Sequence, residues 1–399
     1  MKIQLWSYNY APEPTGIAPL STVWAHAMTA RGHDVQVVAA HPHYPEPVWE
    51  MPLRPRRGRL DGIPTVRLPL WAGRGSTAAR LRQELTFTAA LAAAAPLLDK
   101  PDVIVAVSPS FPALSVAMAN ARLRRIPWVM WLQDILPDGA AATGLIDEGA
   151  LLGAARRFEL SAYRDAARVV VISDSFAENL EAKGVPPEHL ARIYNPASQP
   201  VQPTSAATRE TDPRLVLTMG NVGHTQNLVE VVRAFEGSER LKALGARFVI
   251  AGDGVAGDDV RAAIQTDRVE ITGVVGEDRL KALLSKASVA VVSQSYQGRD
   301  FNVPSKLMNF MGYGLATVAA VRPDSEVAKL INNSGGGWVA DGTPGNTFAE
   351  TLIKALEQPD ERDARALNAQ DFARMNFTPE WSAAQFEDVL LAATGQRSL

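Results

Sequence analysis

The sequence predicts an α/β protein made of two Rossmann-like, doubly wound parallel-sheet domains that face each other across a cleft. A chain of 399 residues is longer than a domain with a single hydrophobic core usually is, so two domains are expected. Short apolar runs rich in β-branched residues alternate with helical patterns in both halves. Between the halves, residues 197–213 are rich in Pro, Ser, Thr and Ala and carry neither a helical nor a strand period.

The predicted strands are apolar on both faces, as buried parallel strands should be. In the first half they are residues 2–8, 34–40, 102–108, 128–133 and 168–173. In the second half they are residues 214–220, 247–254, 268–275, 289–295 and 315–321. Predicted helices between them are residues 17–32, 226–236, 277–287, 324–333 and 346–358. Such repeated βα units are typical of doubly wound sheets.

The same pattern gives the domain boundaries. They are a first domain over residues 1–196, a linker over 197–213, a second domain over 214–376 and a helical segment over 377–399. Trp381, Ala384 and Phe386 give the last segment an apolar side. We therefore expect this segment to pack back towards the first domain.

Composition excludes several classes of function. A net charge of -3 argues against a general nucleic-acid binder, which would normally be basic. The absence of cysteine excludes disulfides, thiolate metal sites and a cysteine nucleophile. His41 and His43 flank Pro42, but no carboxylate-rich partner is near them in the sequence, so no metal site is predicted.

Residues 54–59, RPRRGR, form a basic run near Trp49 and Trp71. Two interpretations remain: a solvated loop, or a patch that touches anionic lipid head groups or a lipid-linked acceptor. The N-terminus has no signal-peptide pattern, and the longest apolar segment, residues 85–98, is too short and too rich in Ala to span a bilayer. We expect a cytoplasmic protein, with peripheral contact at the inner face of the plasma membrane as the alternative.

Glycine turns follow several strands of the second half. The predicted ligand-binding residues of these turns are Gly220, Asn221, Gly223, Gln226, Gly252, Gly254 and Val274. Turns after parallel strands meet at the carboxyl edge of the sheet, where ligands bind. Backbone donors and amide side chains suit phosphate and sugar oxygens, which favours a sugar nucleotide over a bare coenzyme. Glycine turns without a ligand are the alternative.

The stretch NVPSKLMNFMGYG, residues 302–314, predicts a helix whose first turn can hold an anion. Pro304 suits a helix start, because its missing N–H would have no partner there. The free N–H groups of the first turn point towards a ligand, with Lys306 beside them. The residues assigned to this contact are Pro304, Ser305, Lys306, Leu307 and Asn309.

Two residues of the first half, Gly16 and Asp134, are candidates for a catalytic role in the cleft. Gly16, after Thr15, opens the first helix and lets a ligand approach the backbone, although a plain turn is the alternative. The pattern is not GxGxxG, so a dinucleotide fingerprint is absent. Asp134 follows the fourth strand and could orient a hydroxyl or act as an acid or base. An N-cap carboxylate, with Pro137 in the first helical turn, is equally open.

These motifs together resemble glycosyltransferase family 4, in particular the branch that builds bacterial O-antigen, capsule and colanic-acid-type polysaccharides. The resemblance covers nearly the whole chain and keeps the motif order. It rests on residues 8–20, 107–147, 219–228, 251–254, 303–314 and 325–339.

The resemblance implies a GT-B fold, in which the first domain takes the acceptor and the second takes the nucleotide sugar. It also implies a retaining, metal-independent hexosyl- or glycosyltransferase without a cofactor. A UDP-sugar is the default donor, with GDP- and dTDP-sugars open. The acceptor implied by the branch is a lipid-linked glycan, and a small-molecule natural-product acceptor is the alternative.

The chain departs from the family in three places. Many members have Arg and Lys in the first glycine turn, where this chain has Asn221 and Gln226, so Lys306 or Arg299 would carry the charge. Many members also have two Glu spaced eight apart, the second of which holds the ribose hydroxyls. Those positions are Phe301 and Asn309 here. Leu136 replaces a Trp of the branch motif after the fourth strand.

A mechanism follows as a hypothesis. The diphosphate lies over the N-terminus of the helix at Pro304, where Ser305 and Lys306 stabilise the charge that grows on the β-phosphate. The anomeric carbon then faces Gly16 and Asp134. The acceptor hydroxyl attacks from the face that the phosphate leaves, and the leaving phosphate takes the proton.

Three rival functions are weaker. A sugar-nucleotide 2-epimerase needs cleft carboxylates and histidines, of which only Asp134 and Asp253 are candidates. A non-catalytic member that binds a sugar nucleotide is motivated by the missing second Glu. A periplasmic sugar-binding protein does not fit the missing signal-peptide pattern.

Overall fold

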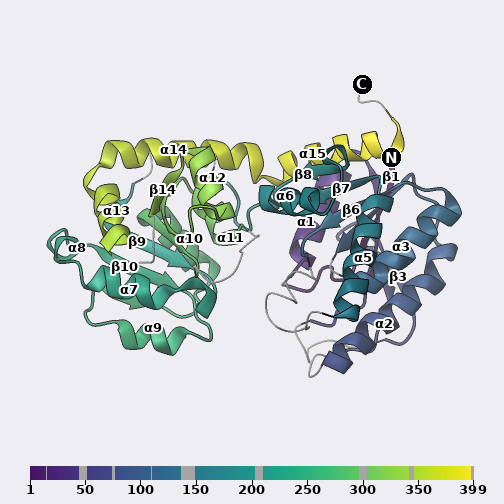
Figure 1. Cartoon of the computed structure of the whole chain (residues 1–399), viewed down its shortest axis with the longest axis horizontal. Coiled ribbons are helices and arrows are strands. Elements are labelled where there is room, and N and C mark those ends of the chain that lie inside the picture. Colours follow the sequence, from purple (N-terminus) through teal and green to yellow (C-terminus); the bar gives the residue numbers. More distant parts are fainter. Residues whose placement is uncertain are drawn as a thin grey trace. The chain divides into compact units, whose positions relative to one another are not determined.

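The computed structural model describes residues 1–14, 16–44, 52–73, 77–108, 110–135, 149–202, 210–295, 303–340 and 346–396. The chain divides into two compact units. Unit 1 comprises Met1–Asn195 with Pro379–Leu399, and unit 2 comprises Pro196–Thr378. Each unit contains a sheet with helices packed around it (Figure 1).

Unit 1 begins and ends the chain. Its strands are β1 (Lys2–Ser7), β2 (Asp34–Ala40), β3 (Arg56–Leu60), β4 (Ile63–Leu68), β5 (Val103–Ser108), β6 (Trp128–Leu132), β7 (Arg168–Val171) and β8 (Leu190–Arg192). Its helices are α1 (Ala18–Ala30), α2 (Thr77–Ala94), α3 (Phe111–Arg124), α5 (Ala150–Asp165), α6 (Asp174–Ala182) and α15 (Pro379–Thr394), with short 3-10 turns η1 (Ala95–Leu97) and η2 (Pro187–His189). The sheet order is β3-β4-β2-β1-β5-β6-β7-β8, and every pair is parallel except β3 with β4.

The basic run is part of a hairpin, which corrects the interpretation of a solvated loop. Strand β3 pairs antiparallel with β4, and its arginines lie exposed on the sheet edge. The two residues of the turn, Asp61 and Gly62, both have positive φ, +48° and +82°. Asp-Gly is a preferred pair for such a two-residue hairpin turn, so this signal was readable in the sequence. Charged side chains on an edge strand also discourage pairing with another chain.

Helix α15 packs into the core of unit 1 through Phe386. The Phe386 ring lies 5.5 Å from the ring of Trp24 and 5.1 Å from that of Trp131. The buried face of α15 also includes Ala383 and Leu390. The predicted apolar side was partly wrong, because Trp381 is 43% exposed.

Unit 2 repeats the βα design. Its strands are β9 (Asp212–Met219), β10 (Arg247–Ala251), β11 (Val269–Ile271), β12 (Ala287–Ser293), β13 (Ala316–Ala320) and β14 (Gly337–Ala340). Its helices are α7 (Leu228–Glu236), α8 (Glu239–Ala243), α9 (Gly257–Ala263), α10 (Glu277–Lys286), α11 (Ser305–Gly312), α12 (Glu326–Ser334), α13 (Asn346–Glu357) and α14 (Pro359–Asn376), with the 3-10 turn η4 (His224–Gln226).

The sheet of unit 2 is parallel throughout, in the order β11-β10-β9-β12-β13-β14. This is the doubly wound order in which the direction of winding reverses between β9 and β12. Its core includes Val216, Phe235 and Phe248, all fully buried. The predicted fold class of two doubly wound sheets is confirmed. Strand β9 begins at Asp212, inside the segment expected to be linker.

Among the described residues, no helix combines the length and the apolar character needed to cross a bilayer.

Candidate functional site

The carboxyl edge of the unit 2 sheet carries an open cavity of about 610 Å³. This volume is within the usual range for small-ligand sites, about 300–1,000 Å³. The lining comes from the turns after β9, β10 and β11, the start of α11, and the segment that precedes β9. The lining residues are Ser198, Gln199, Met219, Gly220, Asn221, Gln226, Ala251, Gly252, Asp253, Val274, Val275, Leu280, Pro304, Ser305, Lys306 and Asn309.

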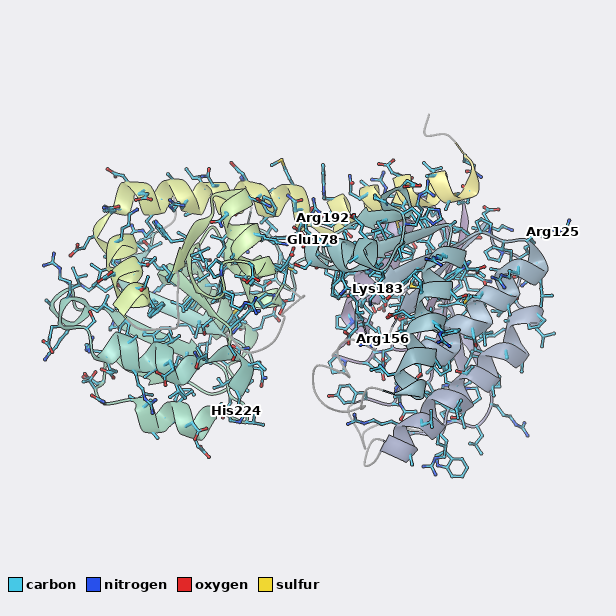
Figure 2. All side chains as sticks on the ribbon, in the orientation of Figure 1. Arg125, Arg156, Glu178, Lys183, Arg192 and His224 are labelled. Atoms are coloured by element: carbon cyan, nitrogen blue, oxygen red, sulfur yellow. The ribbon has the colours of Figure 1, made fainter. Side chains whose placement is uncertain are left out.

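Most of the residues predicted for this site line the cavity. Those that do are Gly220, Asn221, Gln226, Gly252, Val274, Pro304, Ser305, Lys306 and Asn309. Gly223, Gly254 and Leu307 do not. Leu307 is fully buried, because the face of α11 that carries it packs into the core. His224 follows Gly223 and is exposed at the surface of unit 2 (Figure 2).

Two glycines let the turns after β9 and β10 pack against each other. A Cβ on Gly252 would lie 1.9 Å from the carbonyl oxygen of Gly220, and one on Gly254 would lie 2.6 Å from that of Val222. The backbone N–H of Val222 donates to the carbonyl of Asp253 at 3.0 Å. Gly220 itself has a φ of +99°. The floor of the cavity is therefore backbone that no side chain could replace without moving it.

Helix α11 brings its first turn to the cavity. Pro304 is the N-cap, and Ser305, the first helical residue, is exposed. The first-turn N–H groups of a helix have no partner within the helix, and the helix dipole is positive at this end. This end of α11 can therefore attract an anion.

Lys306 brings a buried positive charge to the same place. Its side chain is 6% exposed, and its Nζ donates a hydrogen bond to Oε1 of Gln226. Burial lowers the pKa of Lys306 to about 8. Within the described ranges, no carboxylate forms an ion pair with this ammonium. A buried cation that faces a cavity without a compensating anion favours an anionic ligand.

Asn309, one turn along α11, lines the cavity and also forms hydrogen bonds with other residues. Its side chain is 3% exposed and forms hydrogen bonds with Ser198 and with the backbone of Gln199. No pattern in the sequence assigned residues 198–199 to the cavity, because they lie in a stretch without a structural period. The other cavity residues that sequence reasoning did not assign are Met219, Ala251, Asp253, Val275 and Leu280.

The candidates of unit 1, Gly16 and Asp134, lie in the segments that follow β1 and β6. Gly16 has a φ of +66°, and no other group lies within 4 Å of the position of a Cβ there. Asp134 is exposed, yet partial desolvation raises the pKa of its carboxyl against the opposing effect of the Ile135 N–H. Several residues named from the sequence lie outside the described residues: Thr15, Trp49, Leu136, Pro137, Arg299 and Phe301.

The structure reveals a buried carboxylate that sequence reasoning missed. Glu13 is 3% exposed and accepts hydrogen bonds from the backbone N–H groups of His43 and Tyr44, both at 2.9 Å. It also accepts from Asn9 Nδ2 at 3.0 Å and from the N–H of Tyr10 at 3.3 Å. Glu13 therefore ties the loop after β1 to the loop after β2. In the described part of the chain, no group of three His, Cys, Asp or Glu residues could hold a metal ion.

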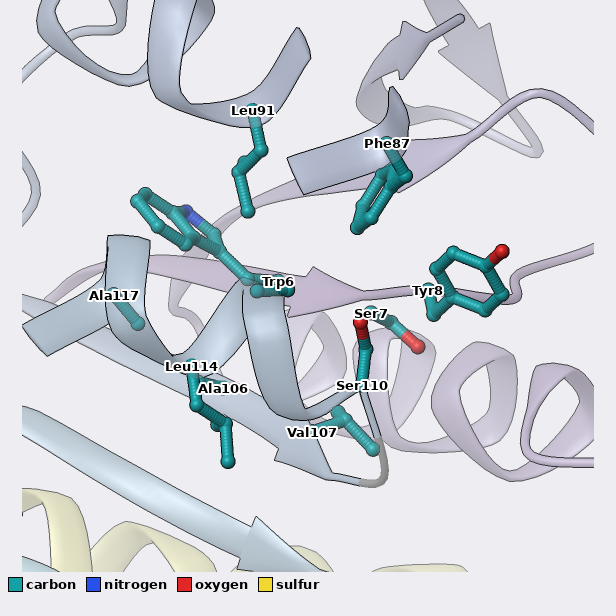
Figure 3. Close-up of a pocket in the computed structure, with 11 residues that line it drawn as sticks. Trp6, Ser7, Tyr8, Phe87, Leu91, Ala106, Val107, Ser110, Leu114 and Ala117 are labelled. Carbon is teal, nitrogen blue, oxygen red and sulfur yellow. The ribbon is translucent and has the colours of Figure 1, made fainter. Parts of the chain in front are cut away.

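A second cavity lies between β1, β5, α2 and α3 in unit 1 (Figure 3). Its volume is about 10 Å³, which is about the space that one water molecule needs. Its walls are mainly apolar, with Trp6, Phe87 and Leu91 among them (Figure 3). This cavity is too small for a substrate.

Two families match the chain. Residues 15–196 match the family described as Glycosyl transferase 4-like domain, and residues 213–358 match the one described as Glycosyl transferases group 1. WcaI of Escherichia coli strain K12, named as a colanic acid biosynthesis glycosyl transferase, is 29% identical over 353 residues. The match covers 83% of this chain and 86% of WcaI.

Solved structures show the same fold. The catalytic domain of starch synthase IV from Arabidopsis thaliana, bound to ADP and acarbose, has a TM-score of 0.69 at 15% identity. That match covers 99% of this chain and 100% of the other. HepE of Anabaena in complex with UDP has a TM-score of 0.66 at 15% identity, with 98% and 99% covered.

Proposed function

Because this chain belongs to glycosyltransferase family 4, whose members transfer sugars from nucleotide donors with retention, we propose that the cavity of unit 2 binds the donor. The chain is a retaining glycosyltransferase with the GT-B fold. The donor proposed here is a UDP-sugar, with GDP- and dTDP-sugars as the alternatives. The relation to WcaI supports a role in the synthesis of a bacterial polysaccharide.

The single observation that carries the donor assignment is the charge balance of the cavity. Lys306 is a buried cation beside the first turn of α11, and the glycine turns after β9 and β10 supply closely packed backbone. A diphosphate supplies the anion that this arrangement lacks. Ser305 and the first-turn N–H groups then meet phosphate oxygens, and Gln226 keeps the Lys306 ammonium in place.

The chemistry follows from where charge develops. As the bond from the anomeric carbon to the β-phosphate oxygen breaks, negative charge grows on that oxygen. Lys306 and the helix N–H groups are already oriented towards an anion, so they stabilise this charge without reorganising. The acceptor hydroxyl forms the new bond on the same face, and its proton passes to the departing phosphate. No protein base is needed in this step.

Gly16 and Asp134 remain the proposed residues of unit 1 for the acceptor side. The acceptor proposed is a lipid-linked glycan, with a small-molecule acceptor as the alternative. An apolar and basic surface on unit 1 supports a lipid-linked acceptor, because such an acceptor lies at a membrane. Trp71, Leu81 and Leu85 are 62%, 56% and 53% exposed, and the guanidinium of Arg82 lies 4.9 Å from the centre of the Trp71 ring. Such a surface suits peripheral contact with the anionic cytoplasmic face of a membrane.

A thermal-shift screen of UDP, GDP, dTDP, ADP and CDP tests the donor assignment. A nucleotide at 100 times its Kd should raise the free energy of unfolding by about 2.7 kcal/mol. We expect one nucleotide to stabilise the wild type and to stabilise Lys306→Ala much less. Lys286→Ala is the matched control, because Lys286 is an exposed lysine of unit 2 that does not line the cavity. Sugar transfer by the purified enzyme then separates catalysis from binding, and no response to any nucleotide would refute the assignment.

A further inference from the structure

Asn309 uses its amide to hold the segment that leads into β9. Its Oδ1 accepts hydrogen bonds from the N–H of Gln199 at 3.0 Å and from the hydroxyl of Ser198 at 3.2 Å. Its Nδ2 donates to the same hydroxyl at 2.8 Å. A carbonyl oxygen has two lone pairs, so Oδ1 has no acceptor left for a ligand hydroxyl.

The same segment is fixed at a second point along α11. The N–H of Gln202 donates to the carbonyl of Gly312 at 2.9 Å. A Cβ on Gly312 would lie 3.4 Å from the side chain of Val201, which is van der Waals contact, so the segment packs directly against α11. Residues 198–202 are therefore part of the wall of unit 2, although their composition resembles that of a linker.

The side-chain carbonyl oxygen of Gln199 is a hydrogen-bond acceptor without a donor among the described residues. Gln199 and Ser198 both line the cavity. Oε1 of Gln199 is shielded from solvent and accepts no hydrogen bond from any described residue. An unpaired, shielded carbonyl is unfavourable, and a turn of the Gln199 side chain that brings Oε1 to a ligand hydroxyl in the cavity removes the penalty.

We propose that Ser198 and Gln199 bind the ribose hydroxyls of the donor nucleotide, and that Asn309 is the positioning residue that holds them there. This proposal rests on the proposed function. Asn309 lies about one helical turn, roughly 5 Å, beyond the first turn of α11 where the diphosphate is placed. The ribose is joined directly to the diphosphate, so its hydroxyls come within reach of the segment that Asn309 holds.

Comparison of UDP with 2′-deoxy-UDP and 3′-deoxy-UDP tests this assignment. We expect the wild type to bind UDP about fivefold to tenfold more tightly than at least one deoxy analogue, since one net hydrogen bond is worth about that factor. Gln199→Ala should remove this preference. Gln202→Ala is the matched control: it removes a glutamine of the same segment whose side chain does not line the cavity, and it should keep the preference.

Kinetics give a second readout. Gln199→Ala should raise the KM for the sugar nucleotide and leave kcat unchanged, because the ribose contact is the same in the ground and transition states. Asn309→Ala should also lose the preference for ribose, and adding Gln199→Ala to it should change little more. If Asn309→Ala does not fold, the Gln199 and Gln202 variants decide alone.

Two failures have different meanings. If the wild type binds UDP but does not distinguish the deoxy analogues, or if Gln199→Ala keeps the wild-type preference, the ribose assignment is wrong and the donor site stands. If the wild type binds none of UDP, GDP, dTDP, ADP and CDP, both the donor site and the ribose assignment are wrong.

Discussion

Units 1 and 2 share a central strand order but use the same point of the sheet differently. In unit 2 the direction of winding reverses between β9 and β12, and an open cavity of about 610 Å³ lies at this carboxyl edge. In unit 1 the reversal lies between β1 and β5, and the cavity there measures only about 10 Å³. Among the described residues, the same topology therefore carries a ligand-sized cavity at this point in unit 2 and only a water-sized one in unit 1.

The difference lies in how the turns are built. In unit 2 the turns are held by backbone contacts that only glycine permits, as at Gly252 against Gly220. In unit 1 the loops after β1 and β2 are held by side chains: Glu13 accepts hydrogen bonds from both loops, and Arg67 donates to the carbonyls of Ala11 and Ala40. Backbone turns leave space for a ligand and offer N–H donors, whereas a buried side-chain network fills the space that it organises. The cavity of unit 2 thus depends on backbone contacts, whereas the described loops after β1 and β2 in unit 1 depend on side chains.

Loss of the Lys306 ammonium should have the largest effect. Lys306→Ala removes the charge that stabilises the leaving diphosphate, and we expect kcat to fall about 10²–10³-fold, as for removal of one preorganised donor in other enzymes. Turnover of the sugar nucleotide identified by the binding screen measures this. Lys286→Ala should keep full activity, and an undiminished rate for Lys306→Ala would contradict the proposed role.

Gly252→Ala should lower the stability of the protein more than Gly16→Ala, because Gly252 packs against backbone and Gly16 does not. The added Cβ would lie 1.9 Å from a backbone oxygen, which no rotation of a side chain can relieve. We expect the free energy of unfolding to fall by about 3 kcal/mol or more. Gly16→Ala meets no neighbour and costs only about 1 kcal/mol, from its positive φ. Urea unfolding of both variants checks this order, and equal losses would count against it.

Glu13→Gln should destabilise unit 1 and spare the donor site. The amide group of Gln would turn two donor hydrogens towards N–H groups that now donate to a carboxylate oxygen. We expect a loss of about 2 kcal/mol in the free energy of unfolding. The Kd for UDP should stay the same, since Glu13 lies in unit 1 and the cavity in unit 2. A large change in that Kd would show that the two regions are coupled.

The pH dependence of UDP binding should follow Lys306. Burial lowers the pKa of Lys306 to about 8, so the free protein loses this charge as the pH rises through that value. UDP binds the charged form, and its affinity should fall by up to about tenfold per pH unit above about pH 8. The unfolded chain keeps this proton up to about pH 10.4, so the contribution of Lys306 to folding stability rises between those pH values.

Calorimetric titrations at about pH 7 and about pH 9.5 measure the change in UDP affinity. The Lys306→Ala variant serves as the control, because neither its affinity for UDP nor its stability should show the pH dependence attributed to Lys306. A wild-type affinity that stayed constant over this range would contradict the assignment of Lys306 to the phosphate site.

The smallest expected effect is on vesicle binding by the exposed apolar and basic surface of unit 1. Vesicles with anionic lipid should retain the wild type more strongly than neutral vesicles, by about 1 kcal/mol per arginine engaged. Replacement of Leu81 and Leu85 by Gln should weaken flotation with these vesicles and leave the Kd for UDP unchanged. Equal binding of the wild type to neutral and anionic vesicles would refute the membrane contact.

The sequence by itself determined the two-sheet fold and most of the residues that line the cavity of unit 2. Strand periods and glycine turns are local signals, and the turns of parallel strands necessarily meet at one edge, so Gly220, Gly252 and Lys306 could be assigned to one cavity. The Asp-Gly turn of the β3–β4 hairpin is also a local signal.

Only the tertiary structure decided the partners of buried polar groups. The pairing of Asn309 with Ser198 joins residues that are 111 positions apart, and Glu13 meets His43 across 30. Neither pair leaves a pattern in the sequence, because a hydrogen bond depends on distance in space and a period records only neighbours along the chain. For the same reason residues 198–202 look like a linker by composition, yet they pack against α11 and place Ser198 and Gln199 in the wall of the cavity.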